Sequence, residues 1–206
     1  MKFKLWVIGA VLVVTAGAAF VALGGYNVAA DEPHWRLTSS VMETVRERSI
    51  AARSADIAVP PLDDEAQVRT GAGNYDAMCA GCHLRPGEEN SELRAGLYPQ
   101  PPDLARHGVH DPAAAFWVIK HGIKMSGMPA WGGHMEDDYI WGLVAFMKRL
   151  PGLSEASYRD HVEASSGHAH GGMAAEPDHG SDDHHADEAK PASSHEHAQG
   201  TPPHDD

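Results

Sequence analysis

Hydrophobic residues follow three different patterns along this chain, and each pattern predicts a different kind of segment. Leu5 to Leu23 is an uncharged apolar run of 19 residues. As a helix it would be about 28 Å long, close to the ~30 Å hydrocarbon core of a bilayer. From 31 to 160 apolar residues recur at helical spacing, whereas 161–206 contains no Trp, Tyr, Phe, Ile or Leu. The chain therefore divides into an apolar N-terminal segment, a helical middle part and a polar C-terminal segment.

The N-terminal segment, residues 1–30, predicts a single-pass membrane anchor. The hydrophobic part of a signal peptide usually has about 7–15 residues, so the length of this run favours a retained helix. Val28-Ala29-Ala30 leaves a second interpretation open, because small residues of this kind are typical of a signal-peptide cleavage site. Lys2 and Lys4 precede the run and Asp31 follows it. Basic flanks stay cytoplasmic, so the rest of the chain is expected in the periplasm of a bacterium, at the cytoplasmic membrane.

Residues 31–61 predict an amphipathic helical stalk. The stretch Leu37 to Arg53 contains no Pro or Gly, and its apolar positions are spaced as on one helix face, at Leu37, Val41, Val45 and Ser49/Ile50. Ser40 and Glu43 fit a capping box, and Pro60-Pro61 is expected to end the helix. The segment is interpreted as a stalk or a helix lying on the next domain, and docking of a partner is the second interpretation.

Residues 62–160 predict one compact all-α domain. A first helix is expected from Asp63/Asp64 to about Met78, and a second from Pro112 to just before Gly122. A third is expected from about Asp137 to Leu150, with a buried stripe of Ile140, Leu143/Val144, Met147 and Leu150. The Gly- and Pro-rich stretch 87–102 is expected to be an irregular loop, and no strand pattern competes with these helices.

Charge and cysteine content narrow the classes of function. The chain has 16 Lys and Arg against 29 Asp and Glu, a net charge of −13. Such an acidic chain repels phosphate backbones, so nucleic acid is not an expected partner. Only two Cys occur, which excludes a disulfide-rich scaffold.

The two cysteines lie in the motif Cys79-Ala80-Gly81-Cys82-His83, at the expected end of the first domain helix. Two thiols at this spacing can form thioethers with the two vinyl groups of a haem, and the adjacent His can ligate the iron. The alternatives are a redox-active Cys pair, half of a zinc site and a structural disulfide. A redox pair usually accompanies βαβ patterning, and a zinc site would need further ligands at suitable spacing.

A second axial ligand is expected from the stretch 124–131, which reads KMSGMPAW. Met128 lies between Gly127 and Pro129, in a rigid loop that could hold a thioether towards the iron. Met is more often a core residue, but this loop is a poor helix former. Met125 is the rival ligand, with packing as its other interpretation.

Residues 64–150 resemble a class I c-type cytochrome. Gly71 and Tyr75 occupy positions at which that family has a Gly and an aromatic residue on its first helix, and Leu143 and Phe146 resemble their partners on the last helix. The stretch 101–104, Pro-Pro-Asp-Leu, resembles the family's Gly-Pro-Asn-Leu, and 127–131 resembles its Met loop. The resemblance implies a small helical fold around one covalent haem c, in which the carbonyl of Pro102 accepts a hydrogen bond from His83 and orients it.

His/Met ligation predicts an electron carrier rather than an enzyme. Ligands at both axial positions keep substrate from the iron, and the soft thioether stabilises Fe(II) and raises the potential. Redox proteins of a respiratory or dehydrogenase chain are the expected donors and acceptors.

Residues 161–206 predict a disordered tail, because they cannot bury enough apolar surface to offset the entropy lost on folding. Eight of their His are interleaved with Asp and Glu and are candidate ligands for Zn, Cu, Ni or Co ions: His168, His170, His179, His184, His185, His195, His197 and His204. A solubilising acidic tail is the other interpretation. The tail also supports an alternative function, a divalent-metal homeostasis protein with an accessory redox domain.

Overall fold

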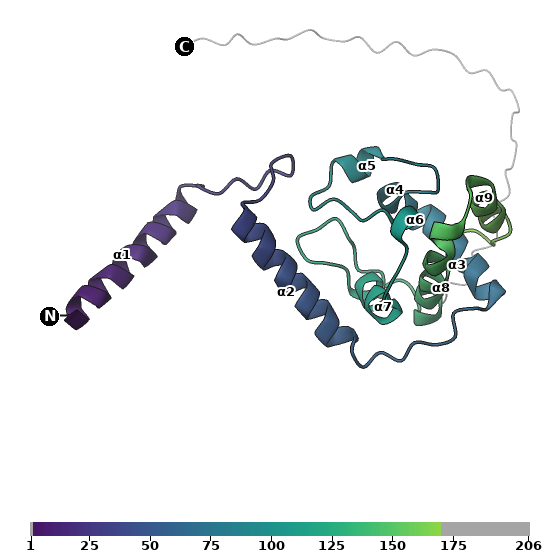
Figure 1. Ribbon diagram of the computed structural model, residues 1–206, viewed down its shortest axis with the longest axis horizontal. Coiled ribbons are helices and arrows are strands. Elements are labelled where there is room, and N and C mark those ends of the chain that lie inside the picture. Colours follow the sequence, from purple (N-terminus) through teal and green to yellow (C-terminus); the bar gives the residue numbers. More distant parts are fainter. Residues whose placement is uncertain (1, 170–206) are drawn as a thin grey trace, which may run out of the picture. The chain divides into compact units, whose positions relative to one another are not determined.

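The computed structural model describes residues 2–169, and within that range the chain is all-helical. The elements, shown in Figure 1, are α1 (Lys2–Ala22), α2 (Arg36–Ser54), α3 (Glu65–Met78), α4 (Ala80–His83), α5 (Glu92–Ala95), α6 (Leu104–His107), α7 (Pro112–His121), α8 (Asp137–Arg149), the 3-10 turn η1 (Leu150–Gly152) and α9 (Glu155–Glu163). The expected all-α class is confirmed for this part of the chain.

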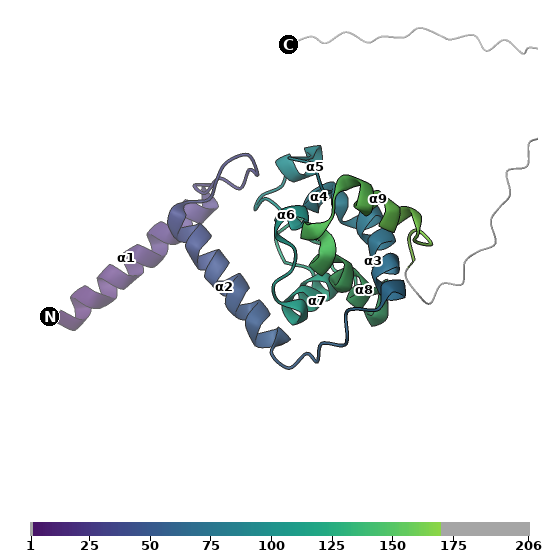
Figure 2. The same ribbon diagram turned by 45° about the vertical axis from the view of Figure 1, so that its right-hand side comes forward.

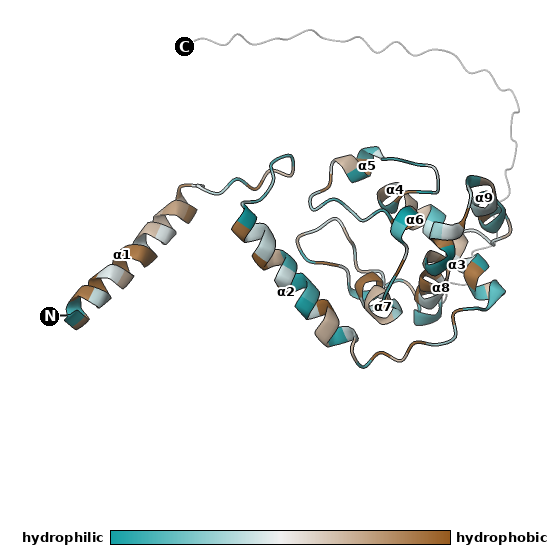
Figure 3. Ribbon diagram, viewed as in Figure 1, coloured by the Kyte–Doolittle hydropathy of each residue, from teal (hydrophilic) through white to brown (hydrophobic). Residues whose placement is uncertain are grey.

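Helix α1 coincides with the apolar run. Its mean hydropathy reaches 2.4 and none of its residues is buried, and it is the most continuously hydrophobic helix in Figure 3. By length and composition α1 could cross a membrane, although a signal sequence at this position would satisfy the same criterion.

Helices α3 and α8 pack against each other and form the centre of the core. The side chain of Asp64 accepts a hydrogen bond from Ala66 N and caps α3, as its sequence predicts. Gly71 is buried where α3 crosses α8, and a Cβ on it would collide with the carbonyl group of Gly142. The two backbones can therefore approach this closely only because residue 71 is glycine.

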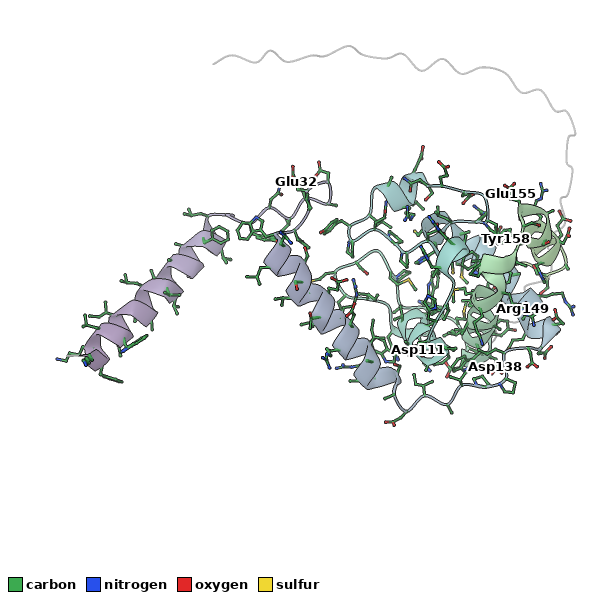
Figure 4. All side chains as sticks on the ribbon, in the orientation of Figure 1. Glu32, Asp111, Asp138, Arg149, Glu155 and Tyr158 are labelled. Atoms are coloured by element: carbon green, nitrogen blue, oxygen red, sulfur yellow. The ribbon has the colours of Figure 1, made fainter. Side chains whose placement is uncertain are left out.

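Helix α8 is buried on more sides than the expected stripe. Every residue from Ile140 to Met147 is buried, because α3 and α7 both pack on this helix. Trp141 stacks on Phe116 of α7 with ring centroids 4.2 Å apart. At its end Arg149, labelled in Figure 4, forms an ion pair with Glu65 across 2.6 Å. These contacts fix α3, α7 and α8 as one unit.

Helix α7 follows its sequence signals. Asp111 caps it through a hydrogen bond from Ala114 N, Pro112 is its first residue, and Gly122 follows its last residue with a φ of +65°. This start and stop are the expected ones.

The C-terminal side of the domain extends beyond the expected boundary at residue 160. Helix α9 ends at Glu163 and lies beside α3 and α8 in both Figure 1 and Figure 2. Tyr158, labelled in Figure 4, is buried against Tyr75 and Phe146. Further along, the side chain of the fully buried Asn74 pairs with both backbone groups of Ala169, at 2.8 and 2.9 Å. Residues 161–169 thus pack on the domain, whereas the tail from 170 onward lies outside the described residues.

Helix α2 differs from its sequence signals in two respects. Leu37, Val41 and Val45, three positions of the predicted apolar face, are 78%, 51% and 60% exposed. The N-cap is Trp35 without a side-chain hydrogen bond rather than a capping box at Ser40. The helix also ends at Ser54, before the two prolines. A different face of α2 lies towards the domain, because α2 packs on α7.

Candidate functional site

A cavity of about 530 Å³ opens between α2, the loops around residues 100 and 126, and α7. That volume lies in the range of about 300–1,000 Å³ typical of small-molecule and cofactor sites. Most of its lining is apolar, including Leu97, Leu104, Val109, Val118, Ile119, Ile123, Trp131 and Met147. Cys79, Cys82, His83 and Met128 line the same cavity, so the fold brings the two candidate motifs to one site.

The cysteines are placed by the end of α3. The N–H of Cys79 donates to the carbonyl of Tyr75 at 2.9 Å, and the N–H groups of Cys82 and His83 both donate to the carbonyl of Cys79. This single turn continues the helix and directs the motif to the cavity. Burial, with the nearby Cys82 as a smaller cause, raises the pKa of the Cys79 thiol to about 12. A thiol that resists ionisation is a poor redox nucleophile, which disfavours the redox interpretation of the Cys pair.

The imidazole of His83 is oriented by the backbone. Its Nδ1 lies 2.9 Å from the carbonyl oxygen of Pro102. A carbonyl can only accept, so Nδ1 carries the proton and Nε2 keeps its lone pair. Burial lowers the pKa of His83 despite this hydrogen bond. The ring is thereby kept in the neutral form that can ligate a metal.

The loop that carries Pro102 is itself held in place. The Nε of Arg94 donates to the carbonyl of Pro101 at 3.1 Å, and Asp103 caps α6 directly after Pro102. The hydrogen-bond acceptor for His83 is therefore fixed by contacts on both sides.

Tyr75 fixes the chain just after His83. Its hydroxyl donates to the carbonyl of Leu84 at 2.7 Å and also contacts the carbonyl of His83 at 3.2 Å. Leu84 is fully buried and has a φ of +69°, a conformation that costs about 1–3 kcal/mol in a residue other than glycine. The hydroxyl of Tyr75 holds this strained turn, and burial raises the pKa of Tyr75 well above its ordinary value.

The two candidate methionines lie in different environments. Met128 lines the cavity and packs against the core, whereas Met125 is 89% exposed with a φ of +57°. The N–H of Met128 donates to Ser126 Oγ at 3.2 Å, and its carbonyl accepts from Ile123 N at the same distance. A Cβ on Gly122 would lie 2.8 Å from the carbonyl oxygen of Met128. Gly122 thus allows the loop to lie against the end of α7, a role beyond the helix stop that its sequence indicates.

The candidate tail ligands fall mostly outside the described residues, and within residues 2–169 no group of three or more His, Cys, Asp or Glu is placed to hold a metal ion. His168 is the one tail ligand candidate inside that range, and its Nε2 lies 2.9 Å from Met78 Sδ. Met78 also lines the cavity. His168 therefore belongs with the end of the domain rather than with the rest of the tail.

Sequence reasoning missed the contribution of α2 to the site. Arg46 and Ile50, one helical turn apart, both line the cavity. Ile50 is one of the apolar positions of the predicted helix face, whereas no apolar pattern includes Arg46.

A second cavity, of about 440 Å³, is a polar cleft between residues 85–88 and α9. Arg85 pairs there with Asp76 at 2.7 Å and with Glu88 at 3.2 Å, and the hydroxyl of Tyr158 donates to Asp76. These groups satisfy one another, and neither cysteine lines the cleft.

Residues 66–147 match the model of a family described as cytochrome c oxidase, cbb3-type, subunit III. The matched range includes the Cys-x-x-Cys-His motif and Met128. No curated protein and no solved structure matches the chain. Residues 66–147 are thus a c-type cytochrome-like segment. Such a domain implies haem c and fits an electron carrier rather than an enzyme.

Proposed function

We propose that this protein carries single electrons through one covalently bound haem c, as a domain held at the outer face of the cytoplasmic membrane by α1. The observation that carries the proposal is the shared cavity: the Cys-x-x-Cys-His motif and Met128, from distant parts of the chain, line one mostly apolar space. When bound, haem c supplies a one-electron iron couple.

Each residue of the site has a distinct role. Cys79 and Cys82 would form the two thioethers, which retain the cofactor in an open compartment. His83 would offer Nε2 to the iron, with its ring held by Pro102 through Nδ1. Met128 would offer its sulfur as the second axial ligand, and together His83 and Met128 would exclude small molecules from the metal.

The partners are proposed to be redox proteins of a respiratory or dehydrogenase chain. The family that residues 66–147 match is named for a subunit of a terminal oxidase, which supports a respiratory partner. The acidic charge of the chain, −13, favours partners with a basic docking surface.

Covalent attachment tests the proposed function directly. The full chain is produced in a bacterium that attaches c-type haem, and its haem is extracted with acidified acetone. We expect the haem to remain on the polypeptide, and the double variant Cys79→Ala, Cys82→Ala to carry none. The variant Met125→Ala, changed at an exposed position, serves as a control and should retain the haem. Haem recovered in the organic phase from the unaltered protein would refute the proposal.

A second function, divalent-metal binding by the tail, is favoured by the His and acidic residues beyond 169. Residues 170–206 contain nine acidic residues and one Lys. Imidazole must be neutral to coordinate, so binding should weaken as pH falls through about 6.5, whereas carboxylates alone would still bind hard ions below that pH.

The structure indicates where the chain should be truncated to test metal binding by the tail. Removal of everything after residue 160 would cut α9 and the contact between Asn74 and Ala169. Truncation after Ala169 preserves both. Calorimetric titration with Zn²⁺ should then lose its heat signal, with the haem spectrum unchanged. Equal binding by full-length and truncated protein would identify the tail as an acidic appendage only.

A further inference from the structure

Helix α2 lies before the cytochrome-like segment, yet it forms part of the cavity wall. Arg46 and Ile50 line the cavity, and Ser54, one turn further, is 4% exposed. Residues four apart lie on one helix face, so this face is the one turned to the domain. The family match begins only at residue 66, and nothing in it accounts for this wall.

Contacts at both ends hold α2 in place. Before the helix, the N–H of His34 donates to the hydroxyl of Tyr98 at 3.2 Å, and the two rings meet edge-on with centroids 5.0 Å apart. After the helix, Ile57 packs against the hydrophobic core. Between them α2 packs on α7. The position of Arg46 is therefore set by the fold around it.

The charge of Arg46 is unusual for its position. Among the described residues that line the cavity, it is the only one with a fixed charge, and most of the others are apolar. Its ion pair with Glu43 is loose, 3.6 Å from Arg46 Nη2 to Glu43 Oε1. The Arg46 side chain is 35% exposed and that of Glu43 is 59% exposed, so this pair contributes little. A cation at an apolar wall is explained if the molecule that binds in the cavity carries a negatively charged group.

We propose that Arg46 is a cofactor-binding residue, whose guanidinium pairs with a propionate carboxylate of the haem. The inference rests on the proposed function, because it requires haem in this cavity. A carboxylate that enters an apolar cavity needs a partner to offset the loss of water. A guanidinium suits this role because its planar donors match a carboxylate.

Other titratable groups lie near this wall. Glu43 is on α2 itself, and His83 lines the cavity, where its Nδ1 is bound to Pro102. On α7, which packs against α2, Lys120 pairs with Asp137 at 2.7 Å and His121 lies against the ring of Trp117. Arg94 acts on His83 from nearby, but its guanidinium donates to the carbonyl of Pro101 and to Asn90. Arg46 is the cation that lines the cavity itself.

The test measures the midpoint potential of the full-length protein between pH 5 and 9, by optical redox titration in detergent. The variant Arg46→Met should retain covalent haem and an unchanged reduced spectrum. Its potential should be lower than that of the unaltered protein, because an uncompensated carboxylate stabilises Fe(III). The pH at which the potential starts to change should rise by about one unit or more, since loss of a nearby opposite charge shifts a carboxyl by that much.

The control is Arg48→Met, which removes the same charge from the same helix. Arg48 is exposed and does not line the cavity, so its curve should match that of the unaltered protein. Arg46→Lys keeps the charge and should restore most of the original profile.

The outcomes separate the two proposals. If the unaltered protein lacks covalent haem, the proposed function fails. If haem is present and Arg46→Met and Arg48→Met give the same curves, only the role of Arg46 is overturned. If Arg46→Met loses its haem, Arg46→Lys decides: a retained haem with the original profile supports the pairing, and loss in both variants overturns it.

Discussion

Removal of the Tyr75 hydroxyl should destabilise the domain more than the small size of this group indicates. The substitution Tyr75→Phe leaves the ring packing with Phe146, at a centroid distance of 5.6 Å, but deletes the donor to the Leu84 carbonyl at 2.7 Å. Leu84 is fully buried, so water cannot replace the donor. An unsatisfied buried acceptor costs about 1–3 kcal/mol. We expect a loss of about 2 kcal/mol in the free energy of unfolding, since the strained backbone of Leu84 remains and loses its support.

Tyr158→Phe provides a matched control. Its hydroxyl donates to Asp76 at 2.8 Å in a partly buried setting, and Asp76 also accepts from Arg85. The acceptor therefore keeps a partner when the hydroxyl is removed, and the expected cost is about 1 kcal/mol or less. Both variants remove a tyrosine hydroxyl, but only Tyr75→Phe leaves a buried acceptor without a donor.

Urea denaturation of the purified full-length protein in detergent, followed by tryptophan fluorescence, measures both costs. With a slope of about 2 kcal/mol per molar urea, Tyr75→Phe should lower the midpoint by about 1 M and Tyr158→Phe by about half of that or less. Equal shifts in the two variants, or a larger one in Tyr158→Phe, would show that the Leu84 carbonyl does not depend on Tyr75.

Three further substitutions or conditions test other parts of the site and the core. Met128→Ala should remove the weak sulfur-to-iron charge-transfer band of the oxidised protein and lower its potential, because a soft ligand to Fe(II) is lost, whereas Met125→Ala should leave both unchanged; the reverse pattern would assign the ligand to Met125. Gly71→Ala should cost about 1–3 kcal/mol or more by forcing α3 and α8 apart, and Gly133→Ala, where a Cβ would meet nothing within 4 Å, should change the urea midpoint little. Because burial raises the pKa of Tyr75 above its ordinary 10.0, the unfolded chain ionises first and stability should fall as pH rises above about 10, less steeply in Tyr75→Phe; equal alkaline slopes would contradict this.

The elements that the sequence predicts well are those with local signals. The caps at Asp64 and Asp111 and the stop at Gly122 each depend on residues a few positions away, so a short stretch of chain is enough to define them. The motif at 79–83 and the loop around Met128 are recognisable for the same reason, because each is a short stretch of consecutive residues.

The features that the sequence did not predict depend on distant contacts. Asn74 is polar and fully buried, and its partner is the backbone of Ala169, 95 residues later. No local pattern predicts such a pair, so the sequence does not predict that residues 161–169 pack on the domain. Likewise the burial of α8 on several sides follows from the presence of both α3 and α7, which a single-helix stripe cannot show.

The orientation of α2 gives the most instructive difference. Periodicity puts Leu37, Val41, Val45 and Ser49/Ile50 on one apolar face. In the structure Ile50 lines the cavity together with Arg46, and Ser54 is buried, whereas Leu37, Val41 and Val45 are exposed. A rule that counts only apolar positions does not place Arg46 at this wall, whereas the proposed pairing with an anionic cofactor does.

This orientation also indicates that the segment between the apolar helix and the cytochrome-like segment is more than a spacer. A spacer would need only length, and its removal would leave the cofactor environment unchanged. Helix α2, however, supplies Ile50 and Arg46 to the cavity wall, and burial and nearby charge are two of the means by which a protein sets a haem potential. Residues 66–147 carry the two cysteines proposed to form thioethers and both proposed axial ligands, yet the wall on the α2 side comes from outside that range. The potential of the domain should therefore depend on α2 as well as on the ligands, and α2 is part of the site rather than a tether to it.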